Sequence, residues 1–137
     1  MEEHIRLTSF RVNEMQYKFH EGIQPGTRFQ IKPKIECKMG RKDKTLFVNL
    51  SVKVNEDISS PVPFDIHVAM FGTFNVIEEE DQKVFIAEAV ETLYPYLRAM
   101  VASVTANCNI PAYMLPPINP TAIASGENPD VGNENLS

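Results

Sequence analysis

The side chains best suited to chemistry in this sequence are three histidines and a run of four acids. His4, His20 and His67 stand 16 and 47 positions apart, whereas histidines that share a metal ion recur at short, fixed spacings. The acids at residues 78–81 open a helical pattern, where they favour the helix dipole and point in different directions. The sequence also has no glycine-rich phosphate loop and no Gly-x-Ser-x-Gly elbow. We therefore expect no enzymatic activity and no metal or other cofactor.

A contact surface has more support than a catalytic site. Methionine packs irregular shapes and recurs on surfaces that bind many partners. The methionines within the chain are Met15, Met39, Met70, Met100 and Met114. Met70 and Met100 follow periodic apolar faces and are expected in the core, whereas Tyr113-Met114-Leu115 lies in a proline-rich segment that is a better candidate for a binding surface.

Composition excludes several classes of protein. A net charge of -5 on 137 residues offers no dominant basic field for phosphate groups, so we expect no nucleic-acid partner. The 43% hydrophobic content suffices for one domain with a real core. Cys37 and Cys108 stand far apart and no signal peptide is evident, so reduced thiols in the cytoplasm are expected, with one disulfide as the alternative. Charges interrupt the apolar stretches well before the roughly 20 residues needed to span a bilayer, so no membrane insertion is expected.

The first half of the chain alternates with the period of β-strands. Four strands are expected at residues 5–19, 29–37, 46–54 and 64–76. The alternation changes phase between Val12 and Met15, which predicts a β-bulge at Asn13-Glu14. The basic run at residues 38–44 separates two strands and predicts a solvated hairpin turn. Consecutive strands with short connections indicate an antiparallel meander.

The second half changes to a helical period. From Glu80 to about Asn107 apolar residues recur every three or four positions, and Pro95 predicts a kink in this long helix. The seam of the helix consists of Ile86, Val90, Leu93, Leu97, Met100 and Val104. Further apolar side chains lie off the seam, and a helix of this kind is covered on both sides. We therefore expect the seam to form an oligomer interface.

The C-terminal region divides into an apolar loop and a polar tail. Prolines between residues 110 and 120 exclude a helix or a central strand, yet the apolar residues among them predict an ordered loop on the body. Pro120 can start a short second helix, which Gly126 and Pro129 end within about two turns. The composition thus predicts an α+β domain over residues 1–124 and a disordered acidic and polar tail over 125–137.

Several short motifs resemble the SecB family of export chaperones. The most specific are Leu93-Tyr94-Pro95-Tyr96-Leu97-Arg98, Asn109-Ile110-Pro111 and Leu115-Pro116-Pro117-Ile118-Asn119. Two weaker matches resemble the last strand of the family and are Phe64-Asp65-Ile66-His67-Val68 and Gly72-Thr73-Phe74. The resemblance extends from about Phe10 to Ala122.

The resemblance implies both an architecture and a function. It implies a four-stranded sheet, a long kinked helix and a tetramer built as a dimer of dimers. It also implies a cytoplasmic holdase, which keeps preproteins unfolded in hydrophobic grooves and passes them to the SecA translocase ATPase. The residues that would line the client groove are Phe10, Tyr17, Phe71, Phe74, Tyr113, Met114 and Leu115.

The SecA-docking face of the family maps onto the first and last strands. The resemblance places Glu14 and Asp65 on this translocase-docking face. Lys18 and His67 stand at two positions where the family is acidic, so only part of the negative charge is present.

Three further readings stay open at this point. The chain is alternatively a SecB-like chaperone dedicated to one client, such as an antitoxin. A small-ligand-binding or enzymatic α+β domain shares the fold class, and polar residues converging in one pocket would favour it. An adaptor for one folded partner is favoured by a single flat patch instead of apolar grooves.

Overall fold

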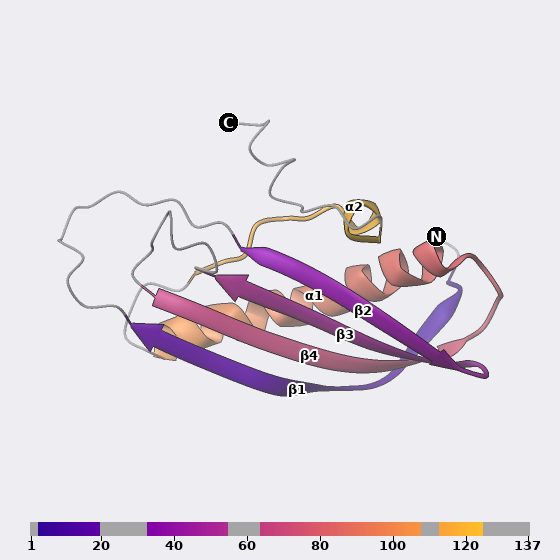
Figure 1. Cartoon of the computed structure of the whole chain (residues 1–137), viewed down its shortest axis with the longest axis horizontal. Helices are drawn as coiled ribbons and strands as arrows, with labels where there is room; N and C mark the ends of the chain where they lie inside the picture. Colours follow the sequence, from indigo (N-terminus) through magenta and orange to yellow (C-terminus); the bar gives the residue numbers. More distant parts are fainter. Residues whose placement is uncertain (1–2, 20–32, 55–63, 108–112, 125–137) are drawn as a thin grey trace.

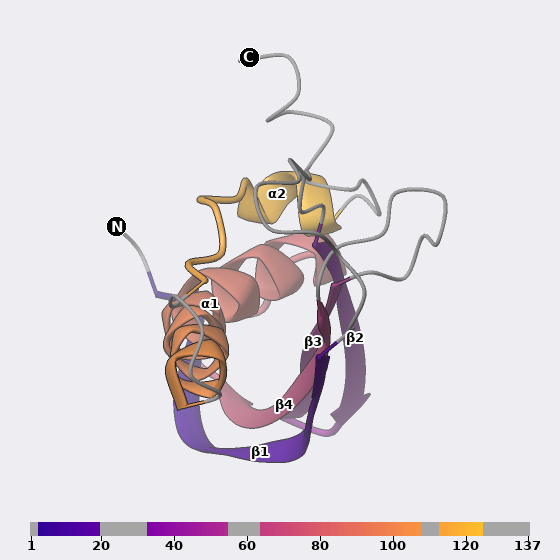
Figure 2. The same ribbon diagram turned by 90° about the vertical axis from the view of Figure 1, so that its left-hand side faces the viewer.

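The expected α+β architecture is confirmed. The computed structural model describes residues 3–19, 33–54, 64–107 and 113–124. Its elements in chain order are β1 (Ile5–Phe19), β2 (Lys34–Lys42), β3 (Thr45–Val54), β4 (Phe64–Val76), α1 (Gln82–Asn107) and α2 (Pro120–Ala124). The strands form one antiparallel sheet in the order β1-β4-β3-β2. Helix α1 lies along one face of this sheet, and none of the described helices lies on the other face (Figures 1 and 2).

The strand order corrects the simple meander. β2, β3 and β4 follow one another as a meander, but β1 pairs with β4 and lies far from β2. This is the order of a Greek key, in which the outlying strand returns beside the last one. The alternation of apolar and polar residues predicts which face of the sheet a side chain lies on, but it does not predict which strands pair.

The core forms where the inner faces of β3 and β4 meet α1. The alternating residues of β3, from Leu46 to Val54, are almost fully buried. Gly72 of β4 permits a close approach of the helix, because a Cβ atom at this position would lie 3.1 Å from Leu93 Cδ1. Leu93 therefore packs directly on the sheet, where any side chain at position 72 would have to displace it.

The helix seam lies against the chain's own sheet. Val90, Leu93 and Leu97 have no exposed area, and Val104 is buried as well. Ile86 and Met100 pack against the same core and are partly buried. A second copy of the chain therefore cannot reach the middle of the seam in this conformation. Pro95 lies inside α1 at an exposed position, away from that seam.

Two predicted backbone features of the sheet are confirmed. The register of β1 against β4 shifts between Val12 and Glu14, which is the predicted bulge, and a second shift lies between Leu7 and Ser9. A hairpin turn joins β2 to β3 as predicted, but it comprises only residues 43–44, because β2 continues through Lys42; Asp43 adopts a φ of 56° there. Aspartate tolerates this left-handed conformation better than most residues, and a tight hairpin requires it.

An ion pair connects the hairpin to the entry of α1. Arg41 donates two hydrogen bonds to the Glu79 carboxylate, at 2.9 and 2.7 Å, and a third to the Asp43 carbonyl. The hydrogen bond from Arg41 lowers the pKa of Glu79. The helix begins at Gln82, two residues later than predicted, so the acids precede it instead of forming its first turn.

The proline-rich segment is ordered over residues 113–119, as predicted. Thr105 has no exposed area, and its Oγ1 accepts a 2.7 Å hydrogen bond from the Tyr113 backbone N–H. The Tyr94 hydroxyl donates to the Pro116 carbonyl, and Leu115 is fully buried. α2 is short, also as predicted. These anchors hold the loop against α1 (Figure 1).

Several predictions fall on residues outside the described ranges. They are the turn near residues 22–26, the tail at 125–137 and the state of Cys108. Cys37 is a free thiol, and burial raises its pKa to about 12. Because the thiolate is the reactive form, Cys37 is chemically inert near neutral pH.

The start of β1 is tied to α1 by His4. Its Nδ1 lies 2.6 Å from Glu88 Oε2, its backbone N–H donates to the other oxygen of the same carboxylate, and Nε2 lies 3.8 Å from Glu80. The hydrogen bond to Glu88 is the main cause that raises the pKa of His4. Burial opposes this effect, and the charges of nearby glutamates add to it.

The His4 contact makes stability depend on pH. The pKa of His4 is higher in the folded chain than its ordinary value of 6.5. Protonated His4 therefore stabilises the fold fully at pH values below 6.5, and this contribution is lost as the pH rises through the folded-state pKa. We expect His4→Gln to lower the thermal midpoint most at about pH 6 and least at about pH 9. Glu91→Gln, an exposed change on the same helix, should give a difference that varies little with pH. A His4→Gln effect that grew with pH would contradict the assignment.

Candidate client-binding surface

The inner face of β1 is apolar and partly uncovered. Its residues pair with buried residues of β4, so they point to the helix side of the sheet. The members of this row, called the β1 strip below, are Phe10, Val12, Met15, Tyr17 and Phe19. Phe10, Val12, Met15 and Phe19 are between 36% and 52% exposed. The cause is position, because β1 is an edge strand with a neighbouring strand on one side only.

Aromatic contacts join the β1 strip to the helix and the loop. The ring of Phe10 lies 4.5 Å from that of Tyr96, which is itself 43% exposed on α1. Tyr17 stacks on Phe64 at 6.1 Å, and Phe64 contacts Tyr113 at 6.3 Å. The apolar surface therefore continues from the edge strand to the proline-rich loop.

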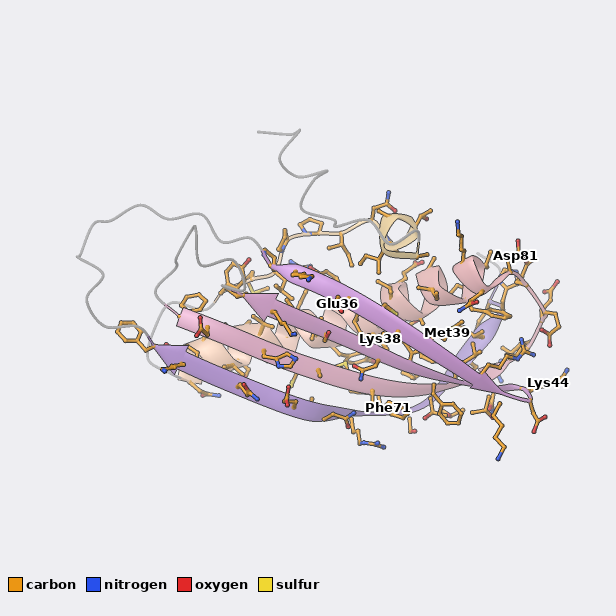
Figure 3. All side chains as sticks on the ribbon, viewed as in Figure 1. Glu36, Lys38, Met39, Lys44, Phe71 and Asp81 are labelled. Atoms are coloured by element: carbon orange, nitrogen blue, oxygen red, sulfur yellow. The ribbon has the colours of Figure 1, made fainter. Side chains whose placement is uncertain are left out.

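The structure divides the predicted client-binding residues among three places. Phe10 and Tyr17 lie on the helix side, Phe10 against Tyr96 and Tyr17 against Phe64, which also contacts Tyr113; the exposed Met114 is next to Tyr113 in the chain. Phe74 and Leu115 lie in the core, with 1% and 0% exposed area, and offer no surface. Phe71 lies on the opposite face of the sheet, as Figure 3 shows.

Sequence reasoning missed part of the surface. Val12, Met15, Phe19 and Tyr96 are all exposed and apolar, yet none was assigned to the groove. The phase change at the bulge already placed Met15 and Phe19 on one face with Phe10. The missing fact was that β1 is an edge strand, which alternation does not reveal.

The backbone of β1 offers a second kind of contact. Within the described residues β1 pairs only with β4, along 15 residues of strand. Its other edge therefore presents backbone donors and acceptors to a further extended chain. An open depression of about 630 Å³ near the end of this strand is lined by Met15 and Tyr17, but also by outer-face residues such as Lys18, Lys53 and His67, so it is not part of the apolar row alone.

The outer face of the sheet is polar around the predicted translocase-docking residues. Glu14 and Asp65 both lie on it, as expected for a docking face. Glu14 Oε1 is 2.6 Å from His67 Nδ1, and Lys18 stands directly across from Asp65. Each predicted acid thus has a basic or titratable neighbour. A hollow of about 370 Å³ lies beside Glu14 and His67.

The described residues contain neither a metal-ion cluster nor a helix suited to a bilayer. No cluster of three or more His, Cys, Asp or Glu side chains there is arranged to hold a metal ion. No helix in the described ranges has the length and apolar character required to cross a bilayer.

Comparison with known proteins gives the family. The model of the family described as preprotein translocase subunit SecB matches residues 2–127. An uncharacterized protein of Methanocaldococcus jannaschii is 30% identical over 125 residues, 84% of this chain and 79% of that protein. The protein-export protein SecB of Caulobacter vibrioides is 29% identical over 102 residues, 69% of this chain and 63% of that protein, which is less than two thirds of its length.

Solved structures give the same fold. A SecB-like chaperone of Mycobacterium tuberculosis, in complex with a peptide from the HigA1 antitoxin, matches with a TM-score of 0.67 at 16% identity. The match covers 84% of this chain and 91% of that one. A Streptococcus agalactiae protein of unknown function matches with a TM-score of 0.50 at 11% identity, over 82% of this chain and 96% of that one. With the family model matching nearly all residues, the chain belongs to the SecB family.

Proposed function

We propose that this chain is a chaperone that holds other polypeptides unfolded, with the β1 strip as its client-binding surface. The observation that carries the proposal is the strip itself, in which four large apolar side chains of one edge strand are at least 36% exposed. Burial of apolar area contributes about 25 cal/mol per Å². A long edge strand with an uncovered apolar row is a typical binding surface for another polypeptide chain.

The chemistry of the surface selects unfolded clients. Contacts to Phe10, Met15 and Tyr96 are apolar and not directional, so they accept many sequences. The free edge of β1 adds hydrogen bonds to any extended backbone. Only unfolded chains present long apolar stretches and an unpaired backbone together. Prolines stiffen the loop that carries Tyr113, which lowers the entropy lost on binding.

The preferred clients in this proposal are precursors of exported proteins, which the chaperone would bind in the cytoplasm before export. The description of the family and the name of the Caulobacter relative support this choice. SecA would then be the receiving partner, and Glu14 and Asp65 on the outer face would contribute to its docking.

A chaperone dedicated to one client is the second candidate, and the charge pairing on the outer face favours it. His67 contacts Glu14, and Lys18 stands across from Asp65, so a translocase would have to compete with a neighbouring side chain for each predicted docking acid. The structural neighbour that holds an antitoxin peptide is consistent with this alternative. Co-sedimentation with purified SecA separates the two: saturable binding supports export, and its absence supports the dedicated client.

We also propose that the chain assembles as a tetramer. Because the chain's own sheet covers the middle of the seam, subunit contacts would use exposed residues of α1 outside the seam, such as Pro95 and Tyr96. Light scattering of the purified wild type measures this assembly, and a monodisperse monomer would exclude it.

The holdase proposal is tested by selectivity for the unfolded state. The purified protein is mixed with a chemically unfolded client as the denaturant is diluted, and separately with the same client in its native form. We expect stoichiometric suppression of light scattering, without nucleotide, and no stable complex with the native client. Equal binding of native and unfolded client, or no suppression at stoichiometric amounts, would refute the proposal.

A further inference from the structure

The outer face of the sheet has an ordered arrangement that the proposed chaperone function does not use. Paired residues of an antiparallel sheet point to the same side, so the strand register arranges this face in rows across all four strands. The three rows nearest the β2–β3 hairpin are Arg6, Asn75, Thr45 and Lys42, then Ser9, Thr73, Phe47 and Gly40, then Arg11, Phe71, Asn49 and Lys38.

Charge is segregated on this face. The three rows contain four cations and no carboxylate, although the whole chain has a net charge of -5. Arg6 has an ion pair with Glu3 at 3.6 Å. Carboxylates first occur in the fourth row, where Glu14 and Glu36 stand at its two ends. The positive region therefore has a defined boundary.

Two aromatic rings occupy the middle of the positive region. Phe47 and Phe71 lie on the two central strands with ring centroids 6.2 Å apart and nearly parallel planes. The Arg11 guanidinium lies 4.6 Å from the centre of the Phe71 ring, and Phe47 is 37% exposed. Nothing lies within 4 Å of the position that a Cβ on Gly40 would occupy, so the surface beside Phe47 is open.

We infer that this surface docks a short acidic segment of a partner protein that carries an aromatic or other apolar anchor. The surface is called the hairpin patch and consists of Arg11, Lys38, Lys42, Phe47 and Phe71. The anchor would pack against Phe47, and flanking carboxylates would face the cations of β1 and β2. Figure 3 shows Lys38 and Phe71 on this helix-free face.

Charge complementarity favours an acidic peptide over a nucleic acid. Single-stranded nucleic acids also stack on aromatic rings between cations. However, they carry a phosphate at every nucleotide and need a groove that follows the backbone, whereas the positive region is only three rows deep. Beyond it Glu14 and Glu36 would repel further phosphates, and so would the net charge of -5. A short acidic segment fits between these limits.

The hairpin patch is separate from the client surface. It lies on the outer face, whereas the β1 strip lies on the helix side of the same sheet. One chain can therefore hold a client and a second, acidic partner at once. A change confined to one surface should leave the other intact, so failure of this inference and failure of the chaperone proposal are distinguishable.

The inference is tested with a defined probe. The probe is a labelled peptide of about 12 residues, made of Asp and Glu with one central Phe, and its binding is followed by fluorescence anisotropy. Lys38→Glu should weaken binding at least about tenfold, and Lys42→Glu should weaken it further. Lys83→Glu makes the same change in net charge at an exposed position on α1 and should have little effect. Binding should fall as salt is raised.

Three outcomes would overturn the inference. They are no binding of the peptide at low salt, equal weakening by Lys38→Glu and Lys83→Glu, and tighter binding of a uridine-rich oligonucleotide than of the peptide. Replacing the central Phe of the probe by Ala, or Phe47 of the protein by Ser, should each weaken binding. If neither did, the aromatic anchor would be wrong. Far-ultraviolet circular dichroism of every variant confirms that the sheet is intact.

Discussion

Leu93→Asp is expected to prevent the chain from folding instead of only separating its subunits. Leu93 has no exposed area, and its methyl groups fill the space over Gly72. Loss of a buried leucine side chain alone costs about 2–5 kcal/mol. An unpaired buried carboxylate adds several kcal/mol, against a total stability of about 5–15 kcal/mol for a domain. Circular dichroism and a thermal melt of the purified variant measure the result.

Tyr96→Asp provides the matched control on the same helix. Tyr96 is 43% exposed, so the charge stays in contact with water and the subunit should fold. If α1 contributes to a tetramer, Tyr96→Asp should also reduce the particle mass in light scattering. A folded, cooperative Leu93→Asp monomer would contradict the packing described here and would return the seam to the subunit interface.

The double variant Phe10→Ser and Met15→Ser is expected to lose most of the suppression of client aggregation. The two side chains are 41% and 45% exposed, so their removal should change subunit stability little. A client would lose two apolar contacts of the β1 strip. At about 25 cal/mol per Å², a loss of about 100 Å² of apolar contact corresponds to a weakening of at least tenfold. Aggregation of an unfolded client, followed by light scattering, measures the effect.

A second double variant tests which face of the sheet binds clients. Phe47→Ser with Phe71→Ser removes two aromatic rings from the outer face and should leave suppression of aggregation unchanged. If both double variants lost suppression equally, the assignment of clients to the helix side would be wrong. If Phe10→Ser and Met15→Ser dissociated the oligomer yet held clients normally, the β1 strip would be a subunit contact instead.

The sequence was sufficient for the elements and for several local details. Alternation predicted four strands, helical spacing predicted α1, and a change of phase predicted the bulge after Val12, because each signal depends only on neighbours along the chain. Prolines likewise predicted a loop without helix or strand and a short second helix, because their effect on the backbone is local. Short motifs around Pro95 and Pro116 also indicated the SecB family, to which the chain belongs.

Tertiary structure decided which of these apolar faces are covered. The seam of α1 was predicted to meet another subunit, but its own sheet buries Leu93 and Leu97, because periodicity identifies a face and not what packs on it. The predicted groove residues are divided among the core, the helix side and the outer face of the sheet. Phe71, for example, points to the outer face, because the strand register decides the side on which its ring lies. The exposure of the β1 strip followed from the strand order β1-β4-β3-β2, which makes β1 an edge. That order depends on pairing between residues that are 45 (Phe19 and Phe64) to 71 (Ile5 and Val76) positions apart, and no local pattern of side chains specifies it.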